Sequence, residues 1–249
     1  MVDLYIYAKS GHAHGLENVR RCAVLAKRLE EFDPILATCD YRAATYAKRV
    51  LKVKKAVGID IFGNLPNMMT RGDILIYDTD EPSDTMTKHM KEYCTASYKV
   101  GVDIDDILID DIFHQRAKIK KDVMMFFGDD DYSNELLKLS EGIDKVDIPL
   151  LLGHYFFYKN EPLLQDIFSQ TIEDDLYIHT IKSTKYLLCS SVQTALESKM
   201  SGNYPVFYHR LDKTVQNTNL IDEFNIPKVK GKNIKQIVDN FYKIISKLQ

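Results

Sequence analysis

Short apolar runs alternate with amphipathic stretches along the first half of the chain. The runs Asp3–Ala8, Pro34–Asp40 and Asp73–Asp78 are rich in apolar residues and have the length of strands. Between them, Arg20–Phe32 and Tyr41–Ala56 carry apolar residues at the spacing of one helix face. Such regular alternation predicts a parallel sheet covered by helices.

The same alternation restarts after Ile112–Asp122, a polar and charged stretch that we interpret as a linker. Asp122–Gly128 reads as a strand, and Asp131–Ile143 reads as a helix. Further strands are predicted at Asp175–His179, Lys185–Ser190 and Tyr204–Tyr208, and further helices at Glu161–Gln170, Ser191–Gly202 and Asn233–Leu248.

This pattern predicts an α/β protein with two doubly wound Rossmann-like domains that face a cleft. We place the first domain at residues 1–115 and the second at residues 122–249, and we expect the last helix to pack back on the first domain. Only Thr180–Thr184 separate two predicted strands of the second domain. A helix normally joins two parallel strands, so one helix of this domain should be missing.

Composition narrows the class of protein. The chain has 249 residues, 45% of them hydrophobic, and a formal net charge of -3, without the basic excess of nucleic-acid-binding proteins. The four cysteines form no C-x-x-C pair, so we expect reduced thiols and a cytoplasmic protein, and we assign no cofactor and no metal ligand. We see no signal peptide, and the apolar runs are too short to span a membrane.

The loop after the first predicted strand carries candidate chemistry. Gly11 and Gly15 permit a tight turn, and the start of the next helix offers free amide groups to a phosphate. His12 and His14 could supply a base near neutral pH. The alternative is a plain turn that exposes both histidines, and the sequence leaves both interpretations open.

Two more loops follow predicted strands in the second half. Gly128 suits a phosphate, but Asp129–Asp131 would repel an anion unless they point away, hold a cation or cap the helix. We favour capping by Asp131. Ser190 and Ser191 lie at a strand-to-helix junction, where they could cap the helix or bind a diphosphate. No G-x-S-x-G pattern marks either serine as a nucleophile.

Several segments carry a family resemblance. Gly15–Leu29 is similar to a loop-and-helix pattern of the form G-x-G-H-x-x-R-C-L-x-L-A, and Met124–Leu139 and Tyr186–Tyr208 match later segments of the same family. These segments resemble the UDP-sugar hydrolase of pseudaminic acid biosynthesis, which shares the GT-B architecture of nucleotide-sugar glycosyltransferases. The resemblance implies a nucleotide sugar such as a UDP-sugar, bound by Gly15, Arg21, Gly128, Asp131, Ser190, Ser191, Gln193 and Thr194.

The chain departs from this family at the residues that the resemblance makes functional. The histidine thought to activate water falls at Asn18, and an amide cannot act as a base near neutral pH. The second glycine of the loop falls at Glu17, and a glycine of the later segment falls at Asp129. Gln193 and Thr194 replace an asparagine and an acidic residue. Two of these changes add negative charge where an anion should bind.

Three hypotheses follow. The first is a UDP-sugar hydrolase or glycosyltransferase of surface or flagellar glycan biosynthesis, in which His12, His14 or Glu17 replaces the base lost at Asn18. The second is a catalytically inactive GT-B-like pseudoenzyme that acts as a binding or assembly partner for another protein. The third is an enzyme with a changed ligand that lacks a diphosphate, in which the acidic loops hold a cation or an amine.

Overall fold

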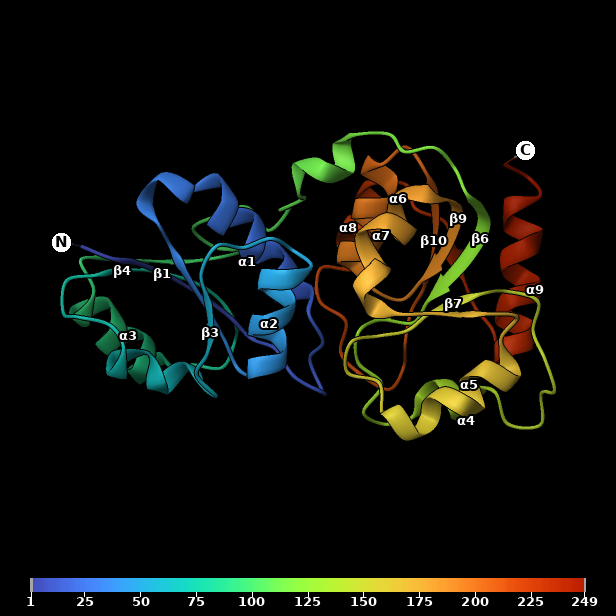
Figure 1. Ribbon diagram of the computed structural model, residues 1–249, viewed down its shortest axis with the longest axis horizontal. Helices are drawn as coiled ribbons and strands as arrows, with labels where there is room; N and C mark the ends of the chain where they lie inside the picture. The colour runs from blue at the N-terminus through green and yellow to red at the C-terminus, as the bar shows by residue number, and fades with distance from the viewer. Residues whose placement is uncertain (1, 249) are drawn as a thin grey trace. The chain divides into compact units, whose positions relative to one another are not determined.

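The computed structural model describes residues 2–248, which form two compact units that divide between Leu108 and Ile109 (Figure 1). Each unit contains a parallel sheet with helices on both faces. The predicted fold class, two doubly wound α/β domains, is therefore confirmed. The division lies before the stretch that we interpreted as a linker. There, the 3-10 helix η3 (Asp111–His114) packs against α7 (Val192–Met200) of the second unit.

The sheet of the first unit has five parallel strands in the order β3-β2-β1-β4-β5. β1 and β4 are neighbours, with Leu4 opposite Ile74 and Ala8 opposite Asp78. The strand order reverses at this pair, so the carboxyl ends of β1 and β4 form the switch point where such sheets bind ligands. The strands are β1 Leu4–Ala8, β2 Ile35–Thr38, β3 Ala56–Gly58, β4 Ile74–Asp78 and β5 Ala96–Lys99.

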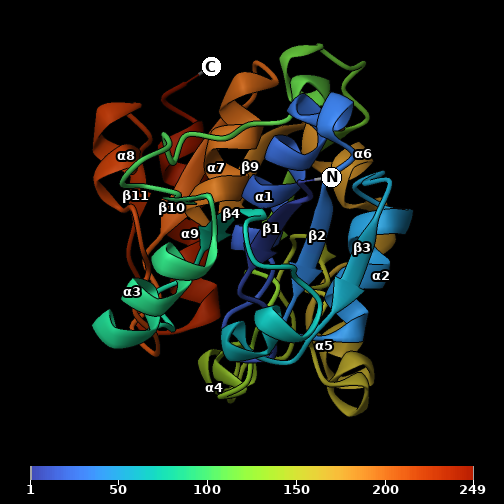
Figure 2. The same cartoon turned by 90° about the vertical axis from the view of Figure 1, so that its left-hand side faces the viewer.

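Different helices cover the two faces of this sheet (Figure 2). Tyr5, Tyr7, Leu75 and Tyr77 alternate along β1 and β4 and share a core with the 3-10 helix η2 and with α3. Helices α1 and α2 cover the opposite face. Period-two burial along a strand thus provides one apolar face for each layer of helices. The helices are α1 Glu17–Arg28, α2 Tyr41–Arg49, η2 Phe62–Asn67 and α3 Asp84–Tyr93.

The sheet of the second unit has six parallel strands in the order β11-β10-β9-β6-β7-β8. β6 and β9 pair at its centre, with Phe126 opposite Cys189. The strand order reverses between these two strands, so their carboxyl ends form the switch point of this unit. The strands are β6 Lys121–Phe126, β7 Leu150–Leu151, β8 Thr171–Ile172, β9 Thr184–Cys189, β10 Tyr204–Tyr208 and β11 Lys228–Val229.

Two layers of helices also enclose this sheet (Figure 1). On one face, Phe126 makes an edge contact with the ring of Tyr177 on α6, and α7 packs on β9 and β10. On the other face, Met125 and Leu188 belong to a core shared with α4, α5 and α9. The helices are α4 Glu135–Leu139, α5 Glu161–Ile167, α6 Tyr177–Ser183, α7 Val192–Met200, α8 Asn219–Glu223 and α9 Ile234–Ile245.

The strand predicted at Asp175–His179 is wrong, because these residues lie in helical structure that leads into α6. The buried positions Tyr177, Thr180 and Ile181 have helical spacing, whereas Leu176 is half exposed. The preceding strand is β8. The helix that we expected to be missing is therefore present, and α6 is that helix.

The last helix, α9, contributes its apolar face to the core of the second unit. Its buried residues are Ile234, Ile237, Val238, Phe241 and Ile245, at the spacing of one helix face, and they join the same core as the strands of that unit. We had expected this helix on the first domain. The sequence shows that α9 is amphipathic but does not show which sheet buries it.

Candidate functional site

The candidate residues lie at the two switch points of the sheets. In the first unit, the loop after β1 leads into α1, and Asp78 ends the neighbouring strand β4. In the second unit, the Gly128 loop follows β6, and Ser190 follows the neighbouring strand β9. Loops at these positions are where open parallel sheets bind ligands. Each unit therefore presents its own candidate site.

The loop after β1 is a tight turn closed by its two glycines. The amide of Gly15 donates to the carbonyl of Gly11 at 2.8 Å, and the amide of His14 donates to the same carbonyl at 3.0 Å. Both glycines have positive φ, 129° and 76°, which other residues rarely adopt. His12 and His14 lie exposed on this turn. Both side chains therefore lie at the surface of the first unit.

Asn18 takes part in a buried polar cluster and does not project as a base would. Its Nδ2 donates to the main-chain oxygen of Asp78 at 2.8 Å, and its Oδ1 accepts from the guanidinium of Arg21 at 3.2 Å. Arg21 also pairs with the Asp78 carboxylate at 2.8 Å. Asn18 therefore ties the start of α1 to the end of β4.

The charges of this cluster stabilise each other. Burial alone would lower the pKa of the Arg21 guanidinium, but the Asp78 carboxylate outweighs that effect and raises the pKa above its ordinary value. Glu17, half-buried at the first position of α1, acts in the same direction. Arg21, which the family resemblance made a nucleotide contact, is thus engaged within its own unit.

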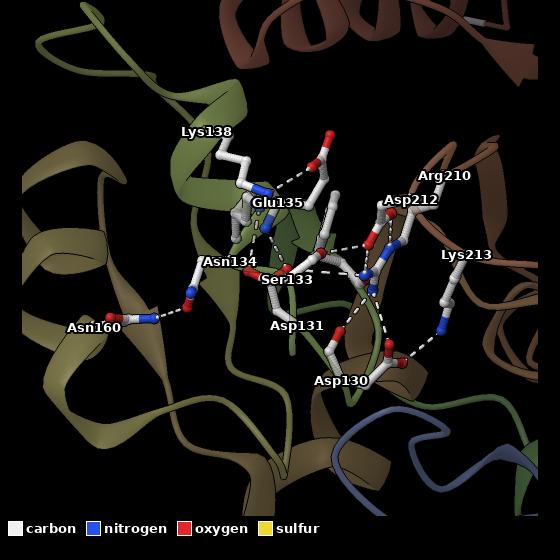
Figure 3. Close-up of polar contacts among 12 residues, drawn as sticks. Asp130, Asp131, Ser133, Asn134, Glu135, Lys138, Asn160, Arg210, Asp212 and Lys213 are labelled. Atoms are coloured by element: carbon white, nitrogen blue, oxygen red, sulfur yellow. Dashed lines mark hydrogen bonds and ion pairs between the residues drawn. The ribbon is translucent and has the colours of Figure 1, made fainter.

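The Gly128 loop is held by a buried ion cluster (Figure 3). Arg210, which follows β10, is 1% exposed and donates to the main-chain oxygens of Phe127 and Asp130. Its guanidinium stacks over the Phe127 ring at 4.4 Å and pairs with the carboxylate of Asp212. Arg210 thereby fastens the loop after β10 to the loop after β6.

Asp131 satisfies the first amides of α4, as the capping interpretation predicted. Its carboxylate accepts from the amides of Glu135 at 2.7 Å and Leu136 at 3.2 Å. Burial raises its pKa to about 6, although Arg210 and those two amides act in the opposite direction. The carboxylate thus occupies the place at the start of α4 that an anionic ligand would take.

Asp130 and Asp212 complete the ion cluster, and each of them also contacts a further side chain (Figure 3). The Nζ of Lys213 lies 2.5 Å from the Asp130 carboxylate, and Ser133 donates to Asp212 at 2.8 Å. Burial acts to raise the pKa of Asp212, but the guanidinium of Arg210 outweighs it and holds that pKa at about 2. The aspartates therefore bind cationic groups of the protein itself.

The junction between β9 and α7 is another candidate binding site in the second unit. The amide of Ser190 donates to the Phe126 oxygen at 3.1 Å, which fixes the junction beside β6. Ser191 caps α7 by accepting from the Thr194 amide at 3.1 Å. The hydroxyl of Ser190 is buried and has no hydrogen-bond partner among residues 2–248. This junction therefore combines a helix start with an unsatisfied hydroxyl group.

Gln193 and Thr194 lie buried in the first turn of α7. Gln193 donates to the carboxylate of Glu197 at 3.0 Å, and the hydroxyl of Thr194 lies 2.7 Å from that of Tyr177. These side chains, which the resemblance made ligand contacts, contact other residues of the second unit.

Sequence reasoning missed several of these residues. Asp78 ends a predicted strand and Arg210 comes shortly after one, so their position was a usable signal. The buried Glu197 gave no such sequence signal, because a glutamate inside a helix is usually exposed. His154 pairs through Nδ1 with the carboxylate of Asp174. His154 follows β7, which lies within the strand-like segment Ile148–Phe157, whereas Asp174 follows β8, a two-residue strand that the sequence pattern did not indicate.

Other classes of site find no support in residues 2–248. No group of three or more His, Cys, Asp or Glu side chains there could hold a metal ion. The four cysteines are free thiols. No helix in the same span is long and apolar enough to cross a membrane.

Comparisons with known proteins find similarity to solved structures but to no family model or curated sequence. The E. coli heptosyltransferase WaaC, solved with ADP-2-deoxy-2-fluoro heptose, aligns over 100% of both chains with a TM-score of 0.46 and 8% sequence identity. A likeness at this level carries no inference about ligand or activity.

Proposed function

We propose that this protein is a glycosyltransferase-like protein that binds a nucleotide sugar, with a UDP-sugar as the first candidate. The phosphates would lie at the junction of β9 and α7, where Ser190 and Ser191 meet the start of a nine-residue helix. The unsatisfied, buried hydroxyl of Ser190 is the observation that carries this proposal.

Physical chemistry favours an anion at this junction over the Gly128 loop. The start of α7 offers amide donors and the positive end of the helix dipole. A buried hydroxyl without a partner costs about 1–3 kcal/mol, and a phosphate oxygen would remove that cost. At the Gly128 loop, by contrast, Asp131 already occupies the amides of α4, a helix of only five residues.

The chemistry on the bound sugar is a further part of the proposal. His12 or His14 on the exposed turn, or Glu17 at the start of α1, would serve as the base that activates water or an acceptor hydroxyl. The family resemblance favours a hydrolase of the pseudaminic acid type within glycan biosynthesis. Gly15 would allow the turn to approach the substrate closely.

One observation favours a second candidate, a pseudoenzyme that binds the nucleotide sugar or a protein partner without turnover. Asn18 occupies the position of the family's base, and both ends of its amide are used to hold Asp78 and Arg21. A residue with this role stabilises the first unit whether or not catalysis occurs.

Binding is tested first, by isothermal titration of the full chain with UDP and UDP-N-acetylglucosamine. We expect saturable heat with wild type, and Ser190→Ala should weaken affinity about five- to tenfold, the effect of one lost hydrogen bond. Ser198→Ala is the matched control, because Ser198 is also buried and its hydroxyl has no hydrogen-bond partner among residues 2–248, but it lies about two turns further along the chain in α7. Absence of binding at millimolar ligand would refute the proposal.

Turnover separates the two candidates. If the protein is an enzyme, wild type releases UDP from a UDP-sugar. Loss of most of that rate with retained affinity in His12→Gln/His14→Gln assigns the base to a histidine, and the same loss in Glu17→Gln assigns it to Glu17. If the protein is a pseudoenzyme, wild type binds the same compound and releases no UDP above the uncatalysed rate.

A further inference from the structure

Cationic side chains gather at one edge of the second sheet. β6, β9 and β10 lie side by side and run parallel, so the segments that lead into them meet at the amino edge of the sheet (Figure 1). Residues 116–122, 182–185 and 199–204 contain seven Lys and Arg residues and one carboxylate, a formal charge of +6, whereas the whole chain carries -3. We call these cations the basic edge, and they are Arg116, Lys118, Lys120, Lys121, Lys182, Lys185 and Lys199.

Packing contacts join the three segments of the basic edge. The amide of Lys120 donates to the main-chain oxygen of Ser183 at 2.9 Å, which connects the first segment to the second. The guanidinium of Arg116 lies so close to Gly202 that a Cβ atom added there would be 3.0 Å from its Nε, which connects the first segment to the third. The cations therefore belong to one continuous edge.

The cations of this edge lack carboxylate partners of the kind that other surface lysines have. Lys55 pairs with Asp33 in the first unit, and Lys228 pairs with Asp222 in the second. Within the part of the chain that the structure describes, no side chain of the basic edge makes an ion pair with a carboxylate. Repulsion among uncompensated like charges is unfavourable, and a negatively charged partner would relieve it.

Two of the lysines contact groups that carry no negative charge. The Nζ of Lys120 lies 3.2 Å from Nε2 of His179 on α6. The Nζ of Lys185 lies 4.7 Å from the centroid of the Tyr186 ring. These contacts fix the directions of the two side chains and leave the positive charge of the edge in place.

Apolar side chains are exposed among the cations. Ile119, between Lys118 and Lys120, is 40% exposed, and Tyr204, at the start of β10, is 46% exposed. An anionic lipid surface suits this combination, because lysines attract its headgroups while Ile and Tyr side chains enter the interfacial layer. Nucleic acid suits it less, because Arg, the residue that recognises phosphates bidentately, supplies one cation of the seven.

We propose that the basic edge is a docking surface for a membrane that contains anionic phospholipids, with the lysines at the headgroups and Ile119 and Tyr204 in the interfacial layer. The surface ends at β7, since Asp144 and Asp147 precede that strand. It lies at the opposite edge of the sheet from the junction of β9 and α7. The inference therefore does not depend on the proposed function, because docking and nucleotide binding use different residues.

The test is sedimentation of the full chain with vesicles of phosphatidylcholine, either pure or with about one-third phosphatidylglycerol, at about 0.1 M salt. Wild type should bind the anionic vesicles at least tenfold more tightly than the pure phosphatidylcholine vesicles. Binding should weaken as added salt screens the charges. No nucleotide is present, so the result is separate from the test of nucleotide-sugar binding.

Charge reversal assigns this binding to the basic edge. Lys118→Glu/Lys120→Glu changes two exposed lysines and should weaken binding to anionic vesicles at least tenfold. Lys54→Glu/Lys55→Glu is the matched control, because it changes the net charge by the same amount on exposed lysines of the first unit. The control variant should bind within about twofold of wild type.

Two further variants test the extent of the surface. Lys118→Glu/Lys199→Glu reverses exposed charges on two different segments and should cause a loss like that of the first double variant. It also replaces that variant if circular dichroism shows that the latter does not fold. Ile119→Asn leaves the charge unchanged and should weaken vesicle binding about fivefold, because an apolar side chain no longer enters the interface.

Three results would overturn the proposal. The first is wild type that does not sediment with anionic vesicles at about 0.1 M salt. The second is an equal loss of binding in Lys54→Glu/Lys55→Glu, which would show a response to net charge alone. The third is binding of wild type to a single-stranded RNA or to polyglutamate without binding to the vesicles, which would assign the basic edge to another anionic macromolecule.

Discussion

The carboxylate of Asp131 caps a helix in a buried position, where burial favours the neutral form of the group. This carboxylate accepts hydrogen bonds from the first two amides of α4, yet burial, with a smaller contribution from the Asp212 carboxylate, raises its pKa to about 6. Arg210 offsets part of that cost by holding all three carboxylates within ion-pair distance. A buried guanidinium with several carboxylates is expensive to disrupt, because removing one partner leaves uncompensated charge in the interior.

The pH dependence of stability should reveal Asp131. The pKa of this carboxyl group is higher in the folded than in the unfolded chain, so the folded state binds more protons between about pH 4 and pH 6. Stability contributed by the protonated form is therefore lost as pH rises through this window. The free energy of unfolding of wild type, minus that of Asp131→Asn, should fall from pH 4 to pH 6 by an amount on the order of 1–3 kcal/mol.

Urea unfolding followed by circular dichroism at pH 4, 5, 6 and 7 measures that difference. Asp212 does not confuse the result, because its pKa is lowered to about 2, and the stability it contributes is lost only as pH falls below about 4. A difference that is flat or that rises between pH 4 and pH 6 would show that Asp131 is not the group responsible.

Local sequence determines that α9 is an amphipathic helix, and tertiary packing determines where this helix lies. Its buried residues recur at helical spacing, and Asn233 caps it by accepting from the amide of Gln236 at 2.9 Å. These features specify a helix with one apolar face. Packing specifies the rest, since that face completes the core over β6, β9 and β10, where α4 and α5 are too short to cover it alone.

Truncation of α9 should therefore affect the second unit. Phe241→Ala removes a fully buried ring and should lower the free energy of unfolding by about 3–5 kcal/mol, the usual cost of such a cavity. Hydrogen exchange should accelerate throughout residues 109–248. Lys243→Ala, on the exposed face of the same helix, should change neither quantity by more than about 0.5 kcal/mol. Faster exchange confined to residues 2–108 after Phe241→Ala would contradict this assignment.

At the scale of the whole molecule, each unit has its own sheet and its own buried core. One core gathers around Tyr7, Phe62 and Tyr77 of the first unit, and the other around Phe127, Leu188 and Phe241 of the second. Each sheet also has its own switch point. Units built in this way can fold on separate hydrophobic cores.

Changes in one core should leave the other folded. Asp78→Ala leaves the buried guanidinium of Arg21 without its carboxylate and should destabilise the first unit by about 3–5 kcal/mol. Thermal unfolding followed by circular dichroism should then show an earlier first-unit transition, while Phe241→Ala moves the transition of the second unit. A single transition that both variants lower equally would mean that the two units unfold together.

The sequence by itself determined the strand–helix alternation, the two parallel sheets and the positions of the loops after β1, β6 and β9. These features follow from local patterns, since apolar periodicity distinguishes strand from helix and the ends of strands mark the loops. Capping of α4 by Asp131 was predicted for the same reason, because the residues involved are neighbours in the chain.

Only the tertiary structure decided what depends on partners far apart in the sequence. The pairing of Arg21 with Asp78, the attachment of Arg210 to the Gly128 loop and the contact of Tyr177 with Glu197 join residues 57, 80 and 20 positions apart. The sequence pattern around a residue does not identify a contact partner that is distant in the chain. Burial then decides whether a charge is a ligand contact or part of the interior, because an interior charge requires a partner within the protein.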